Sequence, residues 1–363
     1  MNFSISNFKS KPGAIFAWSF AVAVALIVST VLGYSYKLAP LSGDLTRLGG
    51  FSEADYGPML PQRAFRRQMY AYGETSAAQA DHRYDLIIFG DSFSVPHADR
   101  ATWVDYLVAA SGLRTLVVPG HGTQSLFDYL ASPSFRSNPP QLIIYESVTR
   151  DLAASIGGAG GRKCDPPPSR LELRLPWRPT GLKPTQLVQR PLRFASLGDR
   201  FGTTAFTLRQ RLTNGLLPPL AGARRLKLSR HDLFSARVPD ELLYLPRDKV
   251  AQSITPSAST LVVCTLSALA RDVERSGRTR FVFMPALDKS AAYAAFEPTR
   301  SFHMPPVLEY LRHSGFKHSA DPSKALEAAI DRGERDIYLP NDTHWGSAGA
   351  AIAANTVAHA IYD

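Results

Sequence analysis

Three runs of apolar and β-branched residues, each ending near glycine or polar residues, place the strongest constraint on how this 363-residue chain folds. They occupy residues 84–90, 113–120 and 141–147, about 28 residues apart. Such runs without polar alternation are typical of strands that are buried on both faces of a parallel sheet. Residues 101–111 and 123–132, which lie between them, carry apolar side chains at helical spacing. The resulting β-α-β-α-β order predicts an α/β fold, a doubly wound and mostly parallel sheet between two layers of helices.

The alternation of helices and strands resumes after residue 250. Residues 257–275 and 347–362 read as helices, and residues 280–285 read as a strand. We therefore expect residues 41–155 and 251–363 to form two parts of one domain.

The segment between these two parts, residues 156–250, is predicted to be a basic insertion rich in proline and arginine. Residues 160–250 hold 18 Lys and Arg but only 7 Asp and Glu, so the whole positive excess of the chain lies here. Arg224-Arg225-Leu226-Lys227 interleaves charged and apolar residues, which suits a surface that faces an anionic glycan or lipid headgroups. An ordinary solvated face is the open alternative. The sequence contains no motif of the usual DNA or RNA readers, so nucleic acid is not an expected partner.

Residues 1–40 form an N-terminal tail followed by an apolar segment. The twenty residues from 14 to 33 carry no charge, and a helix of that length spans about 30 Å of hydrocarbon. We expect a single membrane-spanning anchor in the cytoplasmic membrane, with the remaining chain in the periplasm. A cleaved signal peptide and a buried core helix are the alternatives.

Two motifs carry the residue types of nucleophilic catalysis. Asp91 and Ser92 follow the first predicted strand, at the sheet edge where α/β proteins bind ligands. Asp342 and His344 precede the last helix, and an aspartate in this position can orient the imidazole that takes the proton of Ser92. Each motif alone also fits a helix cap or a turn. The nine histidines show no paired ligand spacing, so neither a metal nor another cofactor is expected.

Two further strand ends supply candidate binding residues. Gly120 and Gly122 follow the second strand and allow the backbone to approach an oxyanion closely. Glu146 and Arg150 end the third strand, four residues apart, and are expected to form a fixed pair at the same crevice. A plain turn and a structural salt bridge are the respective alternatives.

Taken together, these motifs resemble the SGNH hydrolase superfamily, whose fold is a flavodoxin-like three-layer sandwich. Gly90-Asp91-Ser92 matches its nucleophile block, Gly120 its second block, and Asp342 with His344 its C-terminal acid and base. The combination is closest to the AlgJ/AlgX-like group of polysaccharide O-acetyltransferases, although the order of the motifs is permuted relative to the alginate proteins. That narrower resemblance also rests on the following segments: Glu146…Arg150, Pro285…Asp288-Lys289…Tyr293 and Tyr338…Trp345.

The resemblance implies an extracytoplasmic O-acyltransferase that moves an acetyl group onto hydroxyls of a cell-surface or exported polysaccharide. It also implies a membrane-bound O-acyltransferase (MBOAT) partner that supplies the acetyl group. An esterase or deacetylase of acetylated glycan uses the same triad, and a non-catalytic glycan-binding subunit uses the same fold. Lys289 and Tyr293 follow a predicted strand and either line the cleft, face solvent or pack against the protein.

The two cysteines, Cys164 and Cys264, are candidates for a disulfide. In an oxidising periplasm this bond would close a loop of about 100 residues. Two buried thiols are the alternative.

Overall fold

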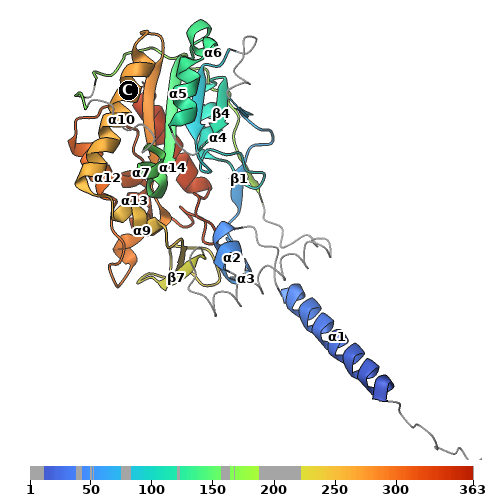
Figure 1. The fold of residues 1–363 in the computed structure, drawn as a ribbon. Helices are drawn as coiled ribbons and strands as arrows, with labels where there is room; N and C mark the ends of the chain where they lie inside the picture. The colour runs from blue at the N-terminus through green and yellow to red at the C-terminus, as the bar shows by residue number, and fades with distance from the viewer. Residues whose placement is uncertain are drawn as a thin grey trace, which may run out of the picture.

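The computed structural model of the chain is drawn in Figure 1. It describes residues 12–37, 43–49, 51, 53–74, 83–120, 123–156, 164–166, 168–187 and 222–362.

A five-stranded parallel sheet with the order β2-β4-β3-β5-β9 forms the centre of the domain. Its strands are β2 (Ala71–Tyr72), β3 (Leu86–Gly90), β4 (Thr115–Pro119), β5 (Leu142–Val148) and β9 (Arg280–Ala286). The α/β fold and its parallel sheet are therefore confirmed. The chain moves from β3 to β4 on one side and then returns past β3 to β5. This reversal creates a switch point, where the carboxyl ends of adjacent strands open a crevice.

Helices lie on both faces of the sheet (Figure 1). On one face α4 (Trp103–Ser111) packs against α14 (Ser347–Tyr362), and on the other α7 (Thr149–Ile156) packs against α10 (Pro256–Glu274). The remaining helices are α5 (Gln124–Ala131), α6 (Pro133–Ser137), α9 (Asp248–Gln252), α11 (Lys289–Ala292), the 3-10 helix η3 (Ala294–Phe296), α12 (Pro306–His313) and α13 (Ser323–Asp331).

Local sequence explains where these elements begin and what they bury. Thr102 and Asp105 form a reciprocal capping box at the start of α4, and Gly112 ends this helix in the left-handed conformation (φ 68°). Every residue of β3, β5 and β9 is buried, as expected for strands covered by helices on both faces. Trp103, the first residue of α4, is fully buried in the main hydrophobic core.

Two short helices precede the sheet, α2 (Asp44–Gly49) and α3 (Glu53–Tyr56). We call residues 43–49 and 53–57 the N-terminal strap. Its apolar side chains, Leu45 and Tyr56, form a small second core with Ala223, Leu243 and Leu245.

The described parts of the predicted insertion pack against the domain. Two small antiparallel pairings involve this segment: β1 (Gln62–Ala64) with β6 (Thr185–Leu187), and β7 (Arg224–Lys227) with β8 (Glu241–Tyr244). Leu233, Phe234 and Leu242 belong to the main hydrophobic core. On the basic strand β7, Arg225 pairs with Glu241 and Lys227 pairs with Asp240. These charges therefore lie on a solvated, ion-paired face. Residues 188–221 of the insertion lie outside the described residues.

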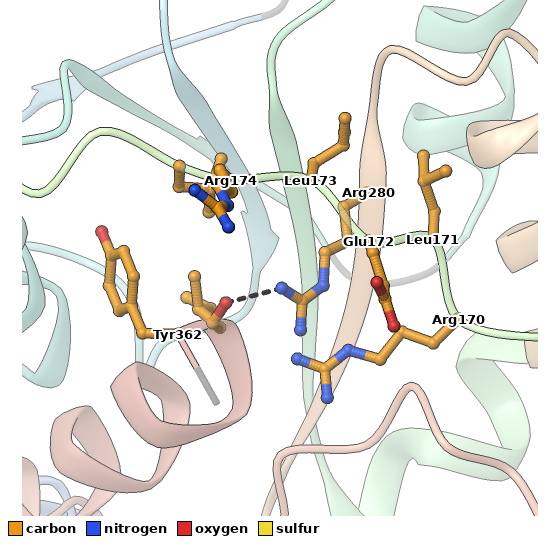
Figure 2. A pocket seen from close by; sticks show the side chains of 9 residues that line it. Arg170, Leu171, Glu172, Leu173, Arg174, Arg280 and Tyr362 are labelled. Atoms are coloured by element: carbon orange, nitrogen blue, oxygen red, sulfur yellow. Dashed lines mark hydrogen bonds between the residues drawn. The ribbon is translucent and has the colours of Figure 1, made fainter.

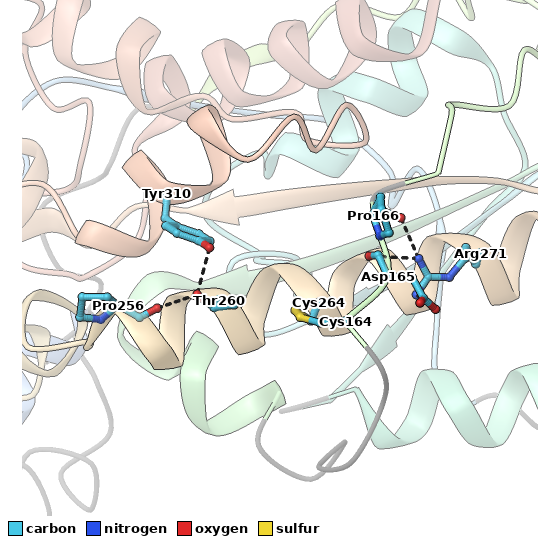
Figure 3. Close-up of a disulfide and its surroundings, with 8 residues drawn as sticks. All are labelled: Cys164, Asp165, Pro166, Pro256, Thr260, Cys264, Arg271 and Tyr310. Carbon is cyan, nitrogen blue, oxygen red and sulfur yellow. Dashed lines mark hydrogen bonds and ion pairs between the residues drawn. A yellow bond between two sulfur atoms is a disulfide. The ribbon is translucent and has the colours of Figure 1, made fainter.

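The predicted disulfide between Cys164 and Cys264 is present, with the two Cα atoms 4.8 Å apart and a sequence separation of 100 residues (Figure 3). It fixes the start of the insertion to α10. Next to it, the Arg271 guanidinium on the same helix donates to the Pro166 carbonyl (3.0 Å), which holds the chain that follows Cys164 against α10.

The apolar N-terminal segment forms α1 (Pro12–Lys37). In the part of the chain that the structure describes, no helix combines the length and the apolar character that crossing a membrane requires. The predicted membrane anchor at residues 14–33 is thus not supported.

Candidate active site

Ser92, His344 and Asp342 come together at the carboxyl edge of the sheet. The His344 ring lies 2.8 Å from the Ser92 hydroxyl through Nε2 and 2.5 Å from the Asp342 carboxylate through Nδ1. Ser92 and His344 are 252 residues apart in the chain. An imidazole between a carboxylate and a hydroxyl is the arrangement in which a serine can be deprotonated for attack on an acyl group.

The turn that carries Ser92 is held by its neighbours in the Gly-Asp-Ser-Phe motif. The Asp91 carboxylate accepts from the Phe93 amide (3.0 Å) and from the Val148 amide of β5 (2.7 Å). A side chain at Gly90 would collide with Ser94 and with Glu146, so only glycine fits where β3 ends. The Phe93 ring packs against the His344 ring, with centroids 4.8 Å apart. These contacts fix the Ser92 hydroxyl relative to the imidazole.

Glu146 on β5 accepts hydrogen bonds from this turn. One carboxylate oxygen accepts from the Asp91 amide (3.0 Å) and the Ser94 hydroxyl (2.7 Å), and the side chain is almost fully buried. Burial and then the charge of Asp91 raise the pKa of Glu146 well above its ordinary value. Because the raised pKa favours the neutral acid, Glu146 acts as a buried hydrogen-bonding group rather than as a charged partner.

The predicted Glu146–Arg150 pair is wrong. Arg150 instead lies 2.5 Å from the Asp288 carboxylate and 3.7 Å from Asp248, beneath α9. Glu146 belongs to β5 whereas Arg150 belongs to α7, so the four-residue spacing of a single helix does not apply. Arg150 therefore joins α7 to the β9–α11 connection and has a structural role.

The loop that carries Asp342 and His344 is held at both ends. Tyr338 and Trp345 form an antiparallel bridge, and the Leu339 amide donates to the His344 carbonyl (3.0 Å). The buried Lys289 ammonium contacts the inside of this loop, and burial lowers the Lys289 pKa to about 7 although Asp342 and other carboxylates oppose the shift.

The N-terminal strap holds the same loop from the other side. The Leu45 amide donates to the Asn341 carbonyl (3.1 Å), and the Asp44 carboxylate accepts from the amide (2.8 Å) and the hydroxyl (2.6 Å) of Thr343. The Asp44 amide lies 3.4 Å from Asp342.

Arg100 and His97 complete the surroundings of the triad. Arg100, 5% exposed, lies 3.7 Å from the Asp342 carboxylate and 3.3 Å from Nε2 of His97. Burial, and then the charges of Arg100 and His344, lower the pKa of His97 to about 3, so this ring is neutral. Burial acts to raise the Asp342 pKa, but the charges of His344 and Arg100 outweigh it and hold the pKa well below its ordinary value. Asp342 is therefore a carboxylate at neutral pH.

The structure gives the predicted oxyanion residue Gly120 a different role. The Gly120 amide donates to the Gly90 carbonyl (3.0 Å) and so belongs to the pairing of β4 with β3, which corrects its predicted role as an oxyanion donor. Gly122 lies outside the described residues. In the described part of the turn, the amides of Phe93 and Ser94 donate to Asp91 whereas the amide of Ser92 makes no hydrogen bond, so it is the best candidate donor.

One cluster has the composition of a metal site. Asp44, Asp342 and His344 each offer one ligand atom, and these atoms lie within 4.8 Å of one another. The same groups hydrogen-bond to each other and to Thr343, which accounts for their closeness without an ion. We assign no metal to them.

A cavity of about 350 Å³ adjoins the triad. Arg66, Arg67, His97 and Arg100 contribute to its lining, and the His97 ring lies against the His344 ring with centroids 5.6 Å apart. Arg66 and Arg67 are exposed, and no ion pair of either is found with the described acidic residues. The cavity thus presents three arginines and the carboxyl group of Asp105, and it meets the triad through His97 and Arg100, which contact His344 and Asp342.

A larger cavity of about 650 Å³ lies away from the triad (Figure 2). Arg280, the first residue of β9, lines it, so it opens at the amino edge of the sheet. Arg280 donates to the Ile361 carbonyl (2.6 Å), and both Arg280 and Arg170 donate to the Ala360 carbonyl. These arginines neutralise the C-terminal end of α14 and need no ligand to explain them.

Sequence reasoning alone does not identify Arg100, His97 and Asp44 as members of the site. Tyr293 is fully buried against Phe234 and therefore belongs to the core rather than to the cleft.

No family model matches the chain, and neither a curated protein nor a solved structure matches it. The fold and the geometry of the site therefore define an α/β protein with a Ser-His-Asp arrangement, and membership of the SGNH superfamily stays a prediction.

Proposed function

We propose that this protein is an O-acyltransferase that moves an acetyl group onto hydroxyls of a polysaccharide outside the cytoplasm. The observation that carries the proposal is the Ser92–His344–Asp342 arrangement, with its contacts of 2.8 and 2.5 Å. The disulfide supports an oxidising compartment. Acetyl as the acyl group, and an MBOAT partner as its source, are inferred from the family resemblance.

The reaction is a double displacement. His344 takes the Ser92 proton at Nε2 as the serine oxygen bonds to the donor carbonyl, and the donor alcohol leaves with that proton when its C–O bond breaks. His344 then takes the proton of a sugar hydroxyl, whose oxygen attacks the acyl-serine. The ester forms on the sugar, and the proton returns to Ser92. Asp342 keeps the Nδ1 proton in place and stabilises the imidazolium in both halves.

The acceptor we favour is an anionic glycan. The exposed Arg66 and Arg67 and the buried Arg100 line the cavity near the triad, and guanidinium groups bind carboxylates with two parallel hydrogen bonds. An acceptor whose carboxylate binds there would extend past His97 for one of its hydroxyls to reach the imidazole.

Replacing Ser92 by Ala tests the enzyme directly. The full chain is incubated with 4-nitrophenyl acetate and an oligouronide, and mass spectrometry follows acetyl on the Ser92 peptide and on the sugar. We expect acetyl on both with the wild type and with the control Ser137→Ala, which changes an exposed serine on α6, and on neither with Ser92→Ala. Acetate without acetylated sugar would make the protein an esterase. Binding of the sugar with no acylation of the wild-type serine would leave a glycan-binding subunit.

A further inference from the structure

Lys289 occupies the inside of the loop that carries Asp342. Its Nζ lies 2.8 Å from the Leu339 carbonyl, 2.9 Å from the Pro340 carbonyl and 3.2 Å from the Asp342 carbonyl. The side chain is 1% exposed, and the Phe234 ring lies 5.1 Å from Nζ.

The number of contacts matches the chemistry of an ammonium group. Although burial lowers the Lys289 pKa to about 7, the protonated amine is the form that fits this loop. A lysine ammonium has three N–H donors and no acceptor, and the loop presents three carbonyl oxygens to it. Burying an amine costs free energy unless its N–H groups find acceptors. The loop carbonyls therefore explain why a lysine stands here, and the hydrophobic core around it does not. No carboxylate lies within ion-pair distance of Lys289 among the described residues, so backbone carbonyls rather than a salt bridge hold it.

The lysine acts on the residue that orients the imidazole. It holds the backbone carbonyl of Asp342, while the carboxylate of the same residue contacts the His344 ring at 2.5 Å. The Asp44 carboxylate holds the next residue, Thr343, on the opposite side. Without the ammonium, the Leu339 carbonyl would keep only the Asp342 amide as a donor (3.3 Å), and the Pro340 and Asp342 carbonyls would lose the lysine donor. The loop would then have to turn these two carbonyls towards water.

We propose that Lys289 is a positioning residue, whose ammonium group keeps residues 339–342 in the conformation that aims the Asp342 carboxylate at Nδ1 of His344. The role rests on the proposed function, since it matters only if His344 acts as the base for Ser92.

The test compares Lys289→Met, which keeps an unbranched side chain one atom shorter and removes its donors, with Lys324→Met, which changes an exposed lysine on α13. A fluorophosphonate counts the reactive serines, and stopped-flow kinetics with 4-nitrophenyl acetate gives the acylation rate per counted serine. Proton NMR of the free protein records the strongly downfield proton shared by His344 and Asp342. We expect Lys289→Met to lower the rate about 10- to 100-fold with little change in KM, as a displacement of about 1 Å does elsewhere, and to shift or broaden the resonance. Lys324→Met should match the wild type in both measurements.

A purely structural lysine would lower the melting temperature and the number of reactive serines, but would leave the rate per serine and the resonance unchanged. That result overturns the proposal. If Lys289→Met does not fold, Lys289→Arg decides in the same way, because a guanidinium places its donors further along the side chain and displaces the carbonyls. If the wild-type serine is never acylated, the proposed function fails, and the NMR comparison still decides the role of Lys289 because it needs no substrate.

Discussion

Replacing Asp342 by Asn tests the central geometry, because it changes charge and hydrogen bonding at nearly constant size. One oxygen of the Asp342 carboxylate accepts from both the ring Nδ1 (2.5 Å) and the backbone amide (3.0 Å) of His344. An asparagine that turns its NH₂ group towards the ring forces the proton to Nε2, where it blocks transfer from Ser92. One that turns its oxygen towards the ring keeps the tautomer but leaves the imidazolium without its counter-charge.

The expected loss is large because the carboxylate is only 6% exposed. In enzymes with a Ser-His-Asp triad this substitution lowers kcat about 10⁴-fold, which corresponds to about 5 kcal/mol of transition-state stabilisation. Asp44→Asn is the matched control. It removes a neighbouring carboxylate that contacts Thr343 instead of the ring, so its effect should stay within about tenfold, the value of one or two hydrogen bonds.

The assay is the pre-steady-state burst of 4-nitrophenolate from 4-nitrophenyl acetate, with circular dichroism as the check on folding. A folded Asp342→Asn protein that acylates Ser92 within tenfold of the wild-type rate would refute the role given to Asp342. Equal losses in the Asp342 and Asp44 variants would show that the two carboxylates act together through the loop and not through the imidazole.

Three further predictions concern stability and the loop. Burial, then Asp288, raises the Asp248 pKa to about 7, so the folded state keeps a proton that the unfolded state releases, and stability falls as pH rises from about 4 to 7. Asp248→Asn should therefore be more stable than wild type at pH 8, by up to about 4 kcal/mol in urea unfolding, and equal unfolding curves would contradict this. Cys264→Ser opens a loop of 100 residues and should lower the free energy of unfolding by about 4 to 5 kcal/mol in guanidinium. Wild-type protein with a reduced disulfide should show the same loss, and a change below about 1 kcal/mol would contradict the prediction. Gly43→Ala places a methyl group against the Asn341 carbonyl and should slow the acylation burst. A burst as fast as that of the wild type would mean that the N-terminal strap shifts without moving the loop that carries Asp342.

The central sheet and its helices could be predicted from the sequence because their signals are local. Buried runs such as those of β3 and β5 have no polar alternation, and α4 begins at a Thr102 cap. Ser92 and His344 could also be predicted, since each follows or precedes such an element, and the contact between them confirms that the two segments meet.

The supporting residues could not be predicted, because their roles arise from contacts between distant parts of the chain. Lys289 contacts carbonyls about 50 residues away, and Asp44 contacts a loop about 300 residues away. Arg100 gives no local pattern that distinguishes it from a surface arginine. The predicted pair of Glu146 and Arg150 is wrong for a different reason. A strand ends and a helix begins between these two residues, so their four-residue spacing does not place them on one helix face.

The docking of the N-terminal strap determines where the chain can be shortened. The first strand of the central sheet to appear in the sequence begins at Ala71, so a domain boundary drawn from the sheet would discard residues 43–57. That cut would remove the Leu45 and Thr46 amides from Asn341 and the Asp44 carboxylate from Thr343. A truncated protein that starts after the strap would keep its sheet and its serine but would lose the contacts that hold one side of the loop carrying His344. Expression of the isolated domain should therefore begin before Gly43.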